Sequence, residues 1–452
     1  MKKSNLVMHT AIMTAVSLIM RSISVSFNAY LTNKIGISGI GLFQLVMSVY
    51  SLAVTFSCAG IRLATTRISV ETSTLKKNDI NKSLVLCLTY AGICGASVGF
   101  MLYGFSNLIS THLINEPQTS LPLKILSLSL PFVAMSSSLG GYFTAIECIP
   151  HYSGIQMLEQ AFKISVVIFL INNSQSSSPF YSCISIVTGM TASEIFSFVL
   201  SMILKRIKSN GKSDKNSINI TKMLRIALPD AAGTCIRSLL LTAEHLLIPK
   251  GFRKSGVNSD DALAAYGRIH GMAMPVILYP SAVLSSLSSL LIPNLAKLNE
   301  TGDKNGINHA VSRNLKRTFV FSIIFSLFFF IFSIPLSEIF YKSCEAAKYI
   351  KILSPLVPIM FTDMVTDGML KGLDQQIYSM RYNIIDSALC VCLVYFLLPE
   401  YSVSGYIFIL YISEVINFAL SINRLRKICN IDIRLFQARK ARNSTFFRLR
   451  KC

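Results

Sequence analysis

Long apolar runs, separated by short polar connections, fill almost the whole chain. Each run is long enough to cross the roughly 30 Å hydrocarbon layer of a membrane as a helix, which takes about 20 residues. Helices are expected because lipid offers no hydrogen-bond partner to an unpaired backbone group. The runs fall near 6–32, 39–61, 83–110, 121–146, 153–172, 181–204, 222–249, 262–293, 317–340, 349–372, 378–398 and 402–423. We therefore predict an all-α polytopic membrane protein with about twelve transmembrane helices, six in each half.

The polar positions inside these runs repeat between the two halves. Arg21 is followed by a serine and, thirteen residues on, by Lys34 (34 − 21). Arg237 is likewise followed by a serine and, thirteen residues on, by Lys250 (250 − 237). The two arginines are 216 residues apart (237 − 21). A duplicated membrane chain with polar residues at matching depths is typical of a two-lobed transporter whose substrate path runs between the lobes.

A second repeat places acids at matching positions. Glu147 corresponds to Asp374, and these two are 227 residues apart (374 − 147). Another acid follows each of them twelve residues later, Glu159 in the first half and Asp386 in the second. The offset is larger than at the arginines by 11 residues (227 − 216), which indicates an insertion near 251–261.

A polar, basic stretch marks the boundary between the halves. We expect residues 205–220 to be a cytoplasmic linker between an N-terminal six-helix lobe, 1–204, and a C-terminal six-helix lobe, 221–425. The remaining tail, 426–452, is basic with interspersed apolar residues. Two interpretations of the tail stay open: an interfacial helix on an anionic leaflet, or a disordered basic extension.

Composition and charge support the membrane assignment. The 452 residues are 52% hydrophobic and 14% charged, against about 25% charged in soluble domains. The net charge of +21 could suggest a nucleic-acid partner, but the bases gather in alternate connections, as the positive-inside rule describes. These clusters lie at 62–82, 205–215, 297–317 and 424–451, whereas the bases at 250–254 run against the pattern. We therefore expect a multi-pass protein of the cell membrane, with both termini cytoplasmic, membrane lipids around it and no nucleic-acid partner.

Basic residues within the spans are candidates for substrate binding. An ionisable residue at membrane depth costs at least about 2.5–3.5 kcal/mol, so each one needs a reason to be there. Arg21 and Arg237 occupy equivalent places in the two halves, and Arg268 and His270 lie in the eighth span. Guanidinium groups in a hydrated cavity would attract an anionic head group such as a phosphate, which they can bind in a bidentate manner. The alternative is that they form structural pairs with carboxylates or with helix-end carbonyls.

Acids within the second half are candidates for ion coupling. Glu244 lies in the middle of the seventh span, and Asp363, Asp367 and Asp374 lie in or just after the tenth. Carboxylates from two helices can bind a small cation such as Na⁺ or exchange a proton. The alternative is that these acids neutralise nearby bases, Lys371 among them.

Three further acids are expected near the cytoplasmic helix ends. Glu147, Glu159 and Asp386 would there tie lobes and loops together as gate residues. The 11 cysteines are scattered and show no metal-ligand or disulfide spacing, so no metal site is predicted. Catalytic motifs are not evident either, and an enzyme is not expected.

Several segments together resemble a known family. The sequence resembles the stage V sporulation protein B-like and polysaccharide biosynthesis branch of the multidrug/oligosaccharidyl-lipid/polysaccharide (MOP) flippase superfamily. The segments that carry the resemblance are 37–50, 57–64, 265–275 and 290–295, with Gly140–Ala145 and the Glu159–Gln160 pair. The resemblance covers about residues 1–425. It implies two six-helix lobes that form a V and a monomeric flippase that moves a polyprenyl-linked saccharide, such as a cell-wall precursor, across the membrane.

The resemblance also suggests roles for single residues. Arg21 and Arg268 fall near cavity positions that bind the diphosphate in lipid II flippases of the superfamily. Glu244 and Asp374 fall near acids of a sodium site, although Leu370 replaces a polar ligand. Apart from a coupling ion, Na⁺ or H⁺, no cofactor is implied.

Two departures from the family pattern bear on the function. Lipid II flippases and many sporulation-type relatives carry fourteen spans, whereas this chain has about twelve. Proton-coupled drug exporters of the MATE family carry an acid in the first span, and residues 6–33 contain none. A cation-coupled multidrug exporter is therefore the second choice. A membrane-embedded glycan polymerase or transferase is disfavoured because the predicted outer loops are too short for a catalytic domain.

Overall fold

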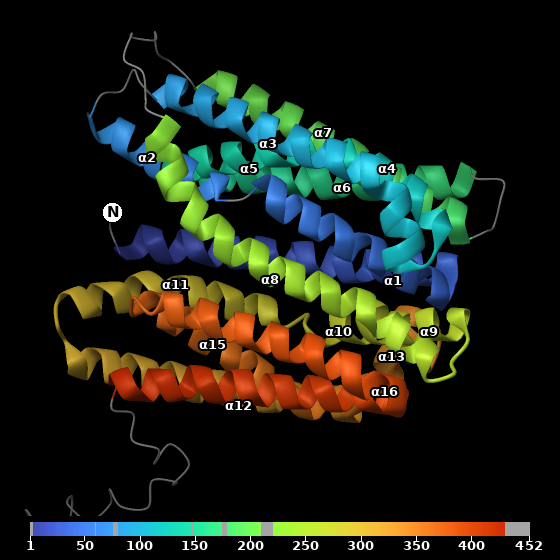
Figure 1. Ribbon diagram of the computed structural model, residues 1–452. Coiled ribbons are helices and arrows are strands. Elements are labelled where there is room, and N and C mark those ends of the chain that lie inside the picture. Colours follow the sequence, from blue (N-terminus) through green and yellow to red (C-terminus); the bar gives the residue numbers. More distant parts are fainter. Residues whose placement is uncertain are drawn as a thin grey trace, which may run out of the picture.

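The computed structural model describes residues 3–58, 60–75, 80–146, 148–173, 179–208 and 220–429, and this part of the chain is helical throughout, without strands (Figure 1). The elements of the first half are α1 (Lys3–Cys58), α2 (Ile61–Leu75), α3 (Ile80–Leu108), η1 (Ile109–Ile114), η2 (Pro117–Thr119), α4 (Ser120–Ser127), α5 (Leu130–Ala145), α6 (Ile149–Asn173) and α7 (Pro179–Lys208). Those of the second half are α8 (Ile220–Lys254), α9 (Ser259–Tyr266), η3 (Gly267–Ala273), α10 (Met274–Ile277), α11 (Ser281–Glu300), α12 (Lys304–Ile331), α13 (Ser333–Tyr341), α14 (Ala347–Leu353), η4 (Ser354–Leu356), α15 (Val357–Gly372) and α16 (Gln376–Cys429). Of the η elements, η1 and η3 are π-helices and η2 and η4 are 3₁₀ turns.

The two longest elements are each a pair of helices joined at one residue. Within α1 the break is at Gly36 (φ 77°, ψ 172°), and within α16 it is at Ser402 (φ 49°, ψ −133°). Positive φ is readily adopted by glycine and is uncommon for other residues. At each break the chain reverses, so that α1 and α16 are hairpins rather than continuous rods (Figure 1).

The number of membrane crossings agrees with the prediction. Among the described residues, nine helices are long and apolar enough to span a membrane, and the pair Pro117–Ser127 and Leu130–Ala145, bent by 45°, makes a tenth. Dividing α1 and α16 at their breaks raises the number to twelve. The predicted eighth span, 262–293, is interrupted around Leu278–Pro280, because proline cannot continue the hydrogen-bond ladder of a helix.

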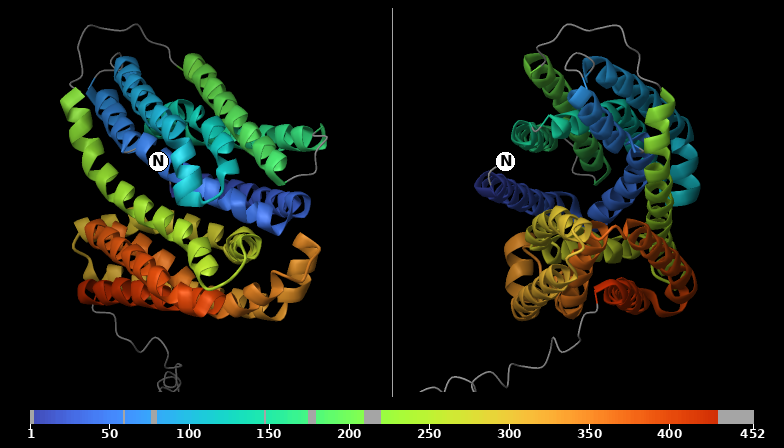
Figure 2. Two further views of the ribbon diagram at one scale, coloured as in Figure 1. Left: turned by 45° about the vertical axis from the view of Figure 1, so that its right-hand side comes forward. Right: turned by 90° about the vertical axis from the view of Figure 1, so that its left-hand side faces the viewer.

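The helices form two groups, with α1 and α8 running between them (Figures 1 and 2). The elements α2–α7 lie on one side and α11–α16 on the other, while α8 packs along α16 and also contacts α1 and α2. The predicted linker falls largely on residues 209–219 and the predicted tail largely on 430–452, both outside the described residues.

The turns lie at two opposite ends of the molecule. We call one the Gly36 end, where α1 and α16 reverse and α8 leads into α9. The other is the Gly60 end, toward which α2 continues past Gly60 and where α11 leads into α12 and α15 into α16. In the predicted topology the Gly36 end is outside the cell and the Gly60 end is in the cytoplasm.

Glycines bring the two halves into backbone contact near the Gly36 end. A Cβ atom on Gly41 of α1 would lie 2.1 Å from the carbonyl oxygen of Leu263, and one on Gly267 of η3 would lie 2.4 Å from that of Ile37. No side chain fits at either position. Small residues of this kind allow membrane helices to approach closely, and here they close the Gly36 end of the space between the halves.

Candidate functional site

A cavity of about 660 Å³ lies between the halves, on the Gly60 side of this glycine contact. Its walls come from α1 and from the segment α8–α10 with Leu278. The lining residues are Arg21, Ser24, Val25, Asn28, Gln44, Met47, Ser48, Ser51, His245, Tyr266, His270, Met274, Pro275 and Leu278. The cavity is thus polar on several sides and apolar on others, as a site for an amphipathic molecule needs to be.

Arg21 carries the permanent positive charge of this cavity. Its side chain is half-buried, and no carboxylate is among the described residues that line the cavity. A guanidinium that faces a membrane cavity without an acid beside it can take its counter-charge from a bound anion. The structure therefore keeps Arg21 as a candidate substrate ligand.

Two histidines and two tyrosines form a polar network on the wall opposite α1. Tyr266 Oη and His245 Nδ1 are 3.0 Å apart, and His270 Nε2 and Tyr406 Oη are 2.7 Å apart. The two imidazole rings meet edge to face at 4.8 Å, and the rings of Tyr266 and His270 are also 4.8 Å apart. His270, predicted from sequence, thus lines the cavity together with His245 and Tyr266, which were not predicted as ligands.

The π-helix η3 and the turn after α10 are each fixed to α1 by a hydrogen bond. The Asn28 amide donates to the carbonyl of Gly271 at 2.5 Å, and the hydroxyls of Ser22 and Tyr279 are 2.7 Å apart. π-Helical turns are frequent at functional sites. These contacts cross from one half to the other and hold His270 against the cavity.

The structure does not bring the three candidate arginines, Arg21, Arg237 and Arg268, together in one cavity. Arg268 Nε lies 2.5 Å from Glu345 Oε2, in an ion pair that is outside the cavity lining. Residues two apart on a helix do not face the same side, so Arg268 and His270 cannot both point at α1. Arg237 is exposed on α8 and is not among the lining residues either.

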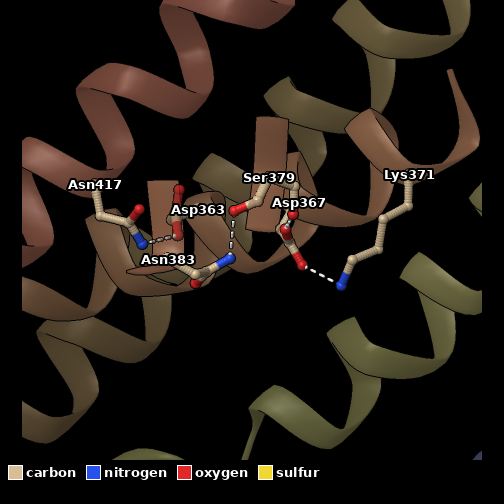
Figure 3. A network of polar contacts seen from close by, with 6 residues as sticks. All are labelled: Asp363, Asp367, Lys371, Ser379, Asn383 and Asn417. Atoms are coloured by element: carbon tan, nitrogen blue, oxygen red, sulfur yellow. Dashed lines mark hydrogen bonds and ion pairs between the residues drawn. The ribbon is translucent and has the colours of Figure 1, made fainter. Parts of the chain in front are cut away.

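A second polar region lies within the second half, around the Asp363 carboxylate of α15 (Figure 3). Asp363 is 8% exposed and accepts a hydrogen bond of 3.1 Å from the Asn417 amide of α16. Among the described residues, its Oδ1 and the Oδ1 of Asn417 have no hydrogen-bond partner. Two buried oxygens without a donor are what a small cation, or a proton on the carboxylate, would satisfy.

Asp367, one turn further along α15, is neutralised locally. It forms an ion pair of 2.6 Å with Lys371, and the Ser379 hydroxyl donates to it (Figure 3). Asn383 donates at 2.9 Å to the carbonyl of Ser379, one turn back on the same helix α16. The interpretation of Asp367 as a charge partner of Lys371, left open by the sequence, is the one that its contacts support.

More acids lie near Asp363 or near one another. Glu244 of α8 is 7% exposed, Asp386 accepts a hydrogen bond from Ser413, and Glu414 lies on the same stretch of α16. Glu244 is close enough to interact electrostatically with Asp386, and Glu414 with both Asp363 and Asp386. We call Glu244, Asp363, Asp386 and Glu414 the acid cluster. Arg237 is the cation in its electrostatic neighbourhood.

This cluster changes the predicted set of ion-coupling residues. Asp374 is exposed, in the left-handed turn between α15 and α16 (φ 60°), and does not join Glu244. Asp386, predicted as a gate residue, lies within the acid cluster. Glu414 and Asn417 were missed, although an acid in the twelfth span was itself a signal.

The other predicted gate residues have different surroundings. Glu159 of α6 is half-buried beside Lys163 and Ser197 within the first half. Glu147 lies outside the described residues. Among the described residues, no three His, Cys, Asp or Glu side chains come close enough together to hold a metal ion. A cation at the acid cluster would therefore need amide, hydroxyl or carbonyl oxygens beside its carboxylates.

Known proteins share this fold and sequence pattern. Residues 6–299 match the family model described as polysaccharide biosynthesis protein, and residues 254–396 match that of MatE. Stage V sporulation protein B of Bacillus subtilis is 23% identical over 96% of this chain and 86% of its own length. Sporulation protein YkvU of the same organism is 22% identical over 30% of each chain.

Solved structures of transporters have the same architecture. The lipid II flippase MurJ in an inward closed conformation superposes with a TM-score of 0.73 at 15% identity, covering 92% of this chain and 87% of that one. A multidrug resistance MATE family transporter of the MOP superfamily, inward-facing, gives 0.72 at 12% identity, with 92% and 98% covered. The relatives are transporters rather than catalysts. With more than half of its length matching the family model, this chain belongs to the polysaccharide biosynthesis protein family of the MOP flippase superfamily.

Proposed function

We propose that the protein moves a polyprenyl-linked saccharide across the cell membrane by alternating access, with its Gly36 end outside and both termini in the cytoplasm. The observation that carries the proposal is the cavity between the halves, whose described lining has Arg21 among apolar and neutral polar side chains and no carboxylate. Such a lining suits an anionic linkage between a sugar and a lipid. The likeness to stage V sporulation protein B and to a lipid II flippase supports the same substrate class.

Each part of the substrate would find a matching surface. Arg21 would bind the phosphate or diphosphate, since a guanidinium presents paired N–H donors to phosphate oxygens. Asn28, Gln44 and His245 would exchange hydrogen bonds with sugar hydroxyls. The polyprenyl chain is too long for a cavity of this size and would stay in the surrounding lipid.

The described state is closed at the Gly36 end by a polar latch between the halves. Arg253 and Glu116 form an ion pair of 2.8 Å, and Ser259 donates to the same carboxylate at 3.1 Å. Lys250 donates to the carbonyl of His112 at 2.8 Å. Alternating access would require these contacts to separate while others form at the Gly60 end. The bases at 250–254 and the insertion near 251–261, both irregular in the sequence pattern, supply this latch.

Transport would be coupled to an ion or proton gradient at the acid cluster. Four buried or half-buried acids with one nearby arginine leave an excess of negative charge within the membrane, which a bound Na⁺ or protons would relieve. Such a ligand drives transport only if it binds one conformation more tightly than the other. Glu244 joins the cluster from α8, the helix that lies between the two halves, so it would sense their relative position.

A cation-coupled multidrug exporter is the second candidate. It is favoured by the match of residues 254–396 to the MatE model and by the aromatic side of the cavity, His245, Tyr266 and His270. A drug cation would lie beside Arg21, however, and like charges in a cavity of low dielectric repel strongly.

Reconstitution separates the two candidates. The purified protein is placed in liposomes with a fluorescent polyprenyl-diphosphate saccharide in one leaflet, and its transfer is followed by quenching from outside. The first proposal expects transfer above that of protein-free liposomes and no uptake of ethidium. Ethidium transport without saccharide transfer would reverse the choice.

A further inference from the structure

We infer that the outward face of α12 binds one anionic phospholipid, with its phosphate on Arg313, Lys316 and Arg317 and its acyl chains on the apolar residues that follow. A shallow groove of about 460 Å³ lies on this face. Its lining consists of the three bases with Val320, Phe321 and Ile324, all from α12. Neither the transport cavity nor the acid cluster includes any of them.

The spacing of these residues makes a single stripe with a charged end and an apolar end. Positions 313, 316/317, 320 and 324 follow one another at three or four residues, which places them on one helix face. Val320 is 52% exposed, Ile324 59% and Leu327, one turn further, 57%. The opposite face, with Val311, Leu315 and Thr318, is buried. The stripe therefore looks away from the protein, while α12 packs on α11, α13, α14, α15 and α16.

The positive charge of this stripe is not neutralised by the part of the chain that the structure describes. The ion pairs there use Arg253, Arg268 and Lys371 as their bases, and none of them involves α12. Arg313 has a hydrogen-bond contact with His309 instead, one turn back on the same helix. Within the described residues these three adjacent cations have no acid paired with them, and an anionic group of another molecule can supply the counter-charge.

Charge and polarity together select that molecule. The C-terminal tail, 430–452, is basic and would be repelled by the stripe. A second copy of this chain that presented the same face would set cations against cations. An anionic phospholipid fits both ends, since guanidinium groups bind phosphate oxygens in pairs and the exposed Val320 and Ile324 accept acyl chains.

The stripe also has a suitable depth in the membrane. The bases lie toward the Gly60 end of α12, and the apolar residues continue from Val320 to Ile331 and into α13. In the proposed orientation the headgroup would therefore lie at the cytoplasmic surface and the acyl chains in the inner leaflet. The positive-inside rule explains why bases occur at this depth of the membrane, but it does not depend on which bases they are. A lipid site, in contrast, depends on Arg313, Lys316 and Arg317 because they border the groove.

The test compares two sets of three neutralised bases. Native mass spectrometry of the purified protein would count bound phosphatidylglycerol and phosphatidylcholine of identical acyl chains. The site variant is R313Q/K316Q/R317Q, and the matched control is K205Q/R206Q/K427Q, which removes bases at the same end of the molecule outside the groove. We expect the site variant to lose one phosphatidylglycerol, or to bind it about tenfold more weakly, and the control to keep it.

Further arms identify the ligand and exclude misfolding. Gel filtration must give the same profile for both variants, which is expected because the Gln substitutions in α12 are at exposed positions. V320N/I324N, which leaves the charges in place, should also weaken phosphatidylglycerol. Equal losses of phosphatidylglycerol binding in the site and control variants would show that binding depends on the net charge of the protein and not on this groove. That result would overturn the proposal. Full displacement by millimolar inorganic phosphate would identify a free-anion site, and preferential binding of a polyprenyl phosphate would identify a substrate site. Either result would overturn it as well.

Discussion

The two polar regions within the membrane differ in charge. The described lining of the central cavity has one arginine and no carboxylate, whereas the acid cluster has four carboxylates with Arg237 nearby. The first region is therefore suited to an anion and the second to a cation or protons. Because each ionised group is costly in the membrane, this separation indicates two ligands rather than one salt-bridge network.

The helix α8 links these regions through two adjacent residues. Glu244 belongs to the acid cluster, and His245 lines the cavity. Neighbouring residues on a helix point in directions about 100° apart, so a single turn of α8 can serve both sites. A change of charge at Glu244 can thereby affect the cavity wall without a long chain of contacts. The predictions below are ordered by the size of the effect that this comparison implies.

The largest effect is expected for the charge of the cavity. Arg21→Ala should lower transfer of the lipid-linked saccharide by about 10- to 100-fold, because one or two charge-assisted hydrogen bonds are lost at about 1.5–3 kcal/mol each. Arg21→Lys should restore only part of it, since an ammonium group lacks the planar fork. The readout is transfer in liposomes at equal protein density. Arg268→Ala is the control, because Arg268 pairs with Glu345 outside the cavity. Normal transfer by Arg21→Ala would remove the anion site from this cavity.

The acid cluster should respond differently from the exposed acid beside it. Glu244→Gln should abolish any dependence of the inward/outward balance on sodium or pH, since the residue would no longer carry a titratable charge. Asp374→Asn should leave that dependence unchanged, because Asp374 is exposed in a turn. The measurement is labelling of cysteines placed in the cavity, in sodium and in potassium, at two pH values. Identical behaviour of the two variants would show that Glu244 is structural.

The latch at the Gly36 end should have a smaller effect on the same balance. Arg253→Ala removes a partly buried ion pair, with side-chain exposures of 20% and 25%, and an interaction of about 1 kcal/mol corresponds to roughly a fivefold shift in population. We expect faster labelling of cavity cysteines from the outside. The exchange of charges in Glu116→Arg/Arg253→Glu should restore the native rate in part. Unchanged labelling in Arg253→Ala would mean that the glycine contact alone closes this end.

The smallest effect is expected for the network between the regions. Tyr406→Phe removes the hydrogen bond to His270 while keeping the buried ring, and a neutral hydrogen bond contributes about 0.5–1.5 kcal/mol. Saccharide transfer should fall about three- to tenfold, with its sodium or pH dependence weakened. Tyr411→Phe, whose hydroxyl donates to the carbonyl of Ile352 away from the cavity, is the matched control. Equal losses in the two variants would assign the Tyr406 effect to packing.

The sequence by itself determined the class of protein, the duplication and about twelve spans. These depend on hydrophobic length and on the cost of unpaired backbone groups in lipid, which act locally along the chain. It also identified single residues that had to be accounted for, such as Arg21, His270 and Glu244. Hydropathy indicates the depth of a residue in the membrane, which was sufficient to identify charged residues within the spans.

Only the tertiary structure decided which of these residues meet. The hydropathy pattern places both Arg21 and Arg268 within membrane spans. In the structure Arg21 lines the cavity, whereas Arg268 pairs with Glu345. Asp386, predicted as a gate residue, lies in the acid cluster, whereas Asp374, predicted as an ion-coupling residue, lies in a turn. The physical reason is that a helix position fixes depth to within a turn, whereas the direction of a side chain depends on helix rotation, on breaks such as Gly36 and on the π-helical turn at His270. Those are set by the packing of helices far apart in the sequence.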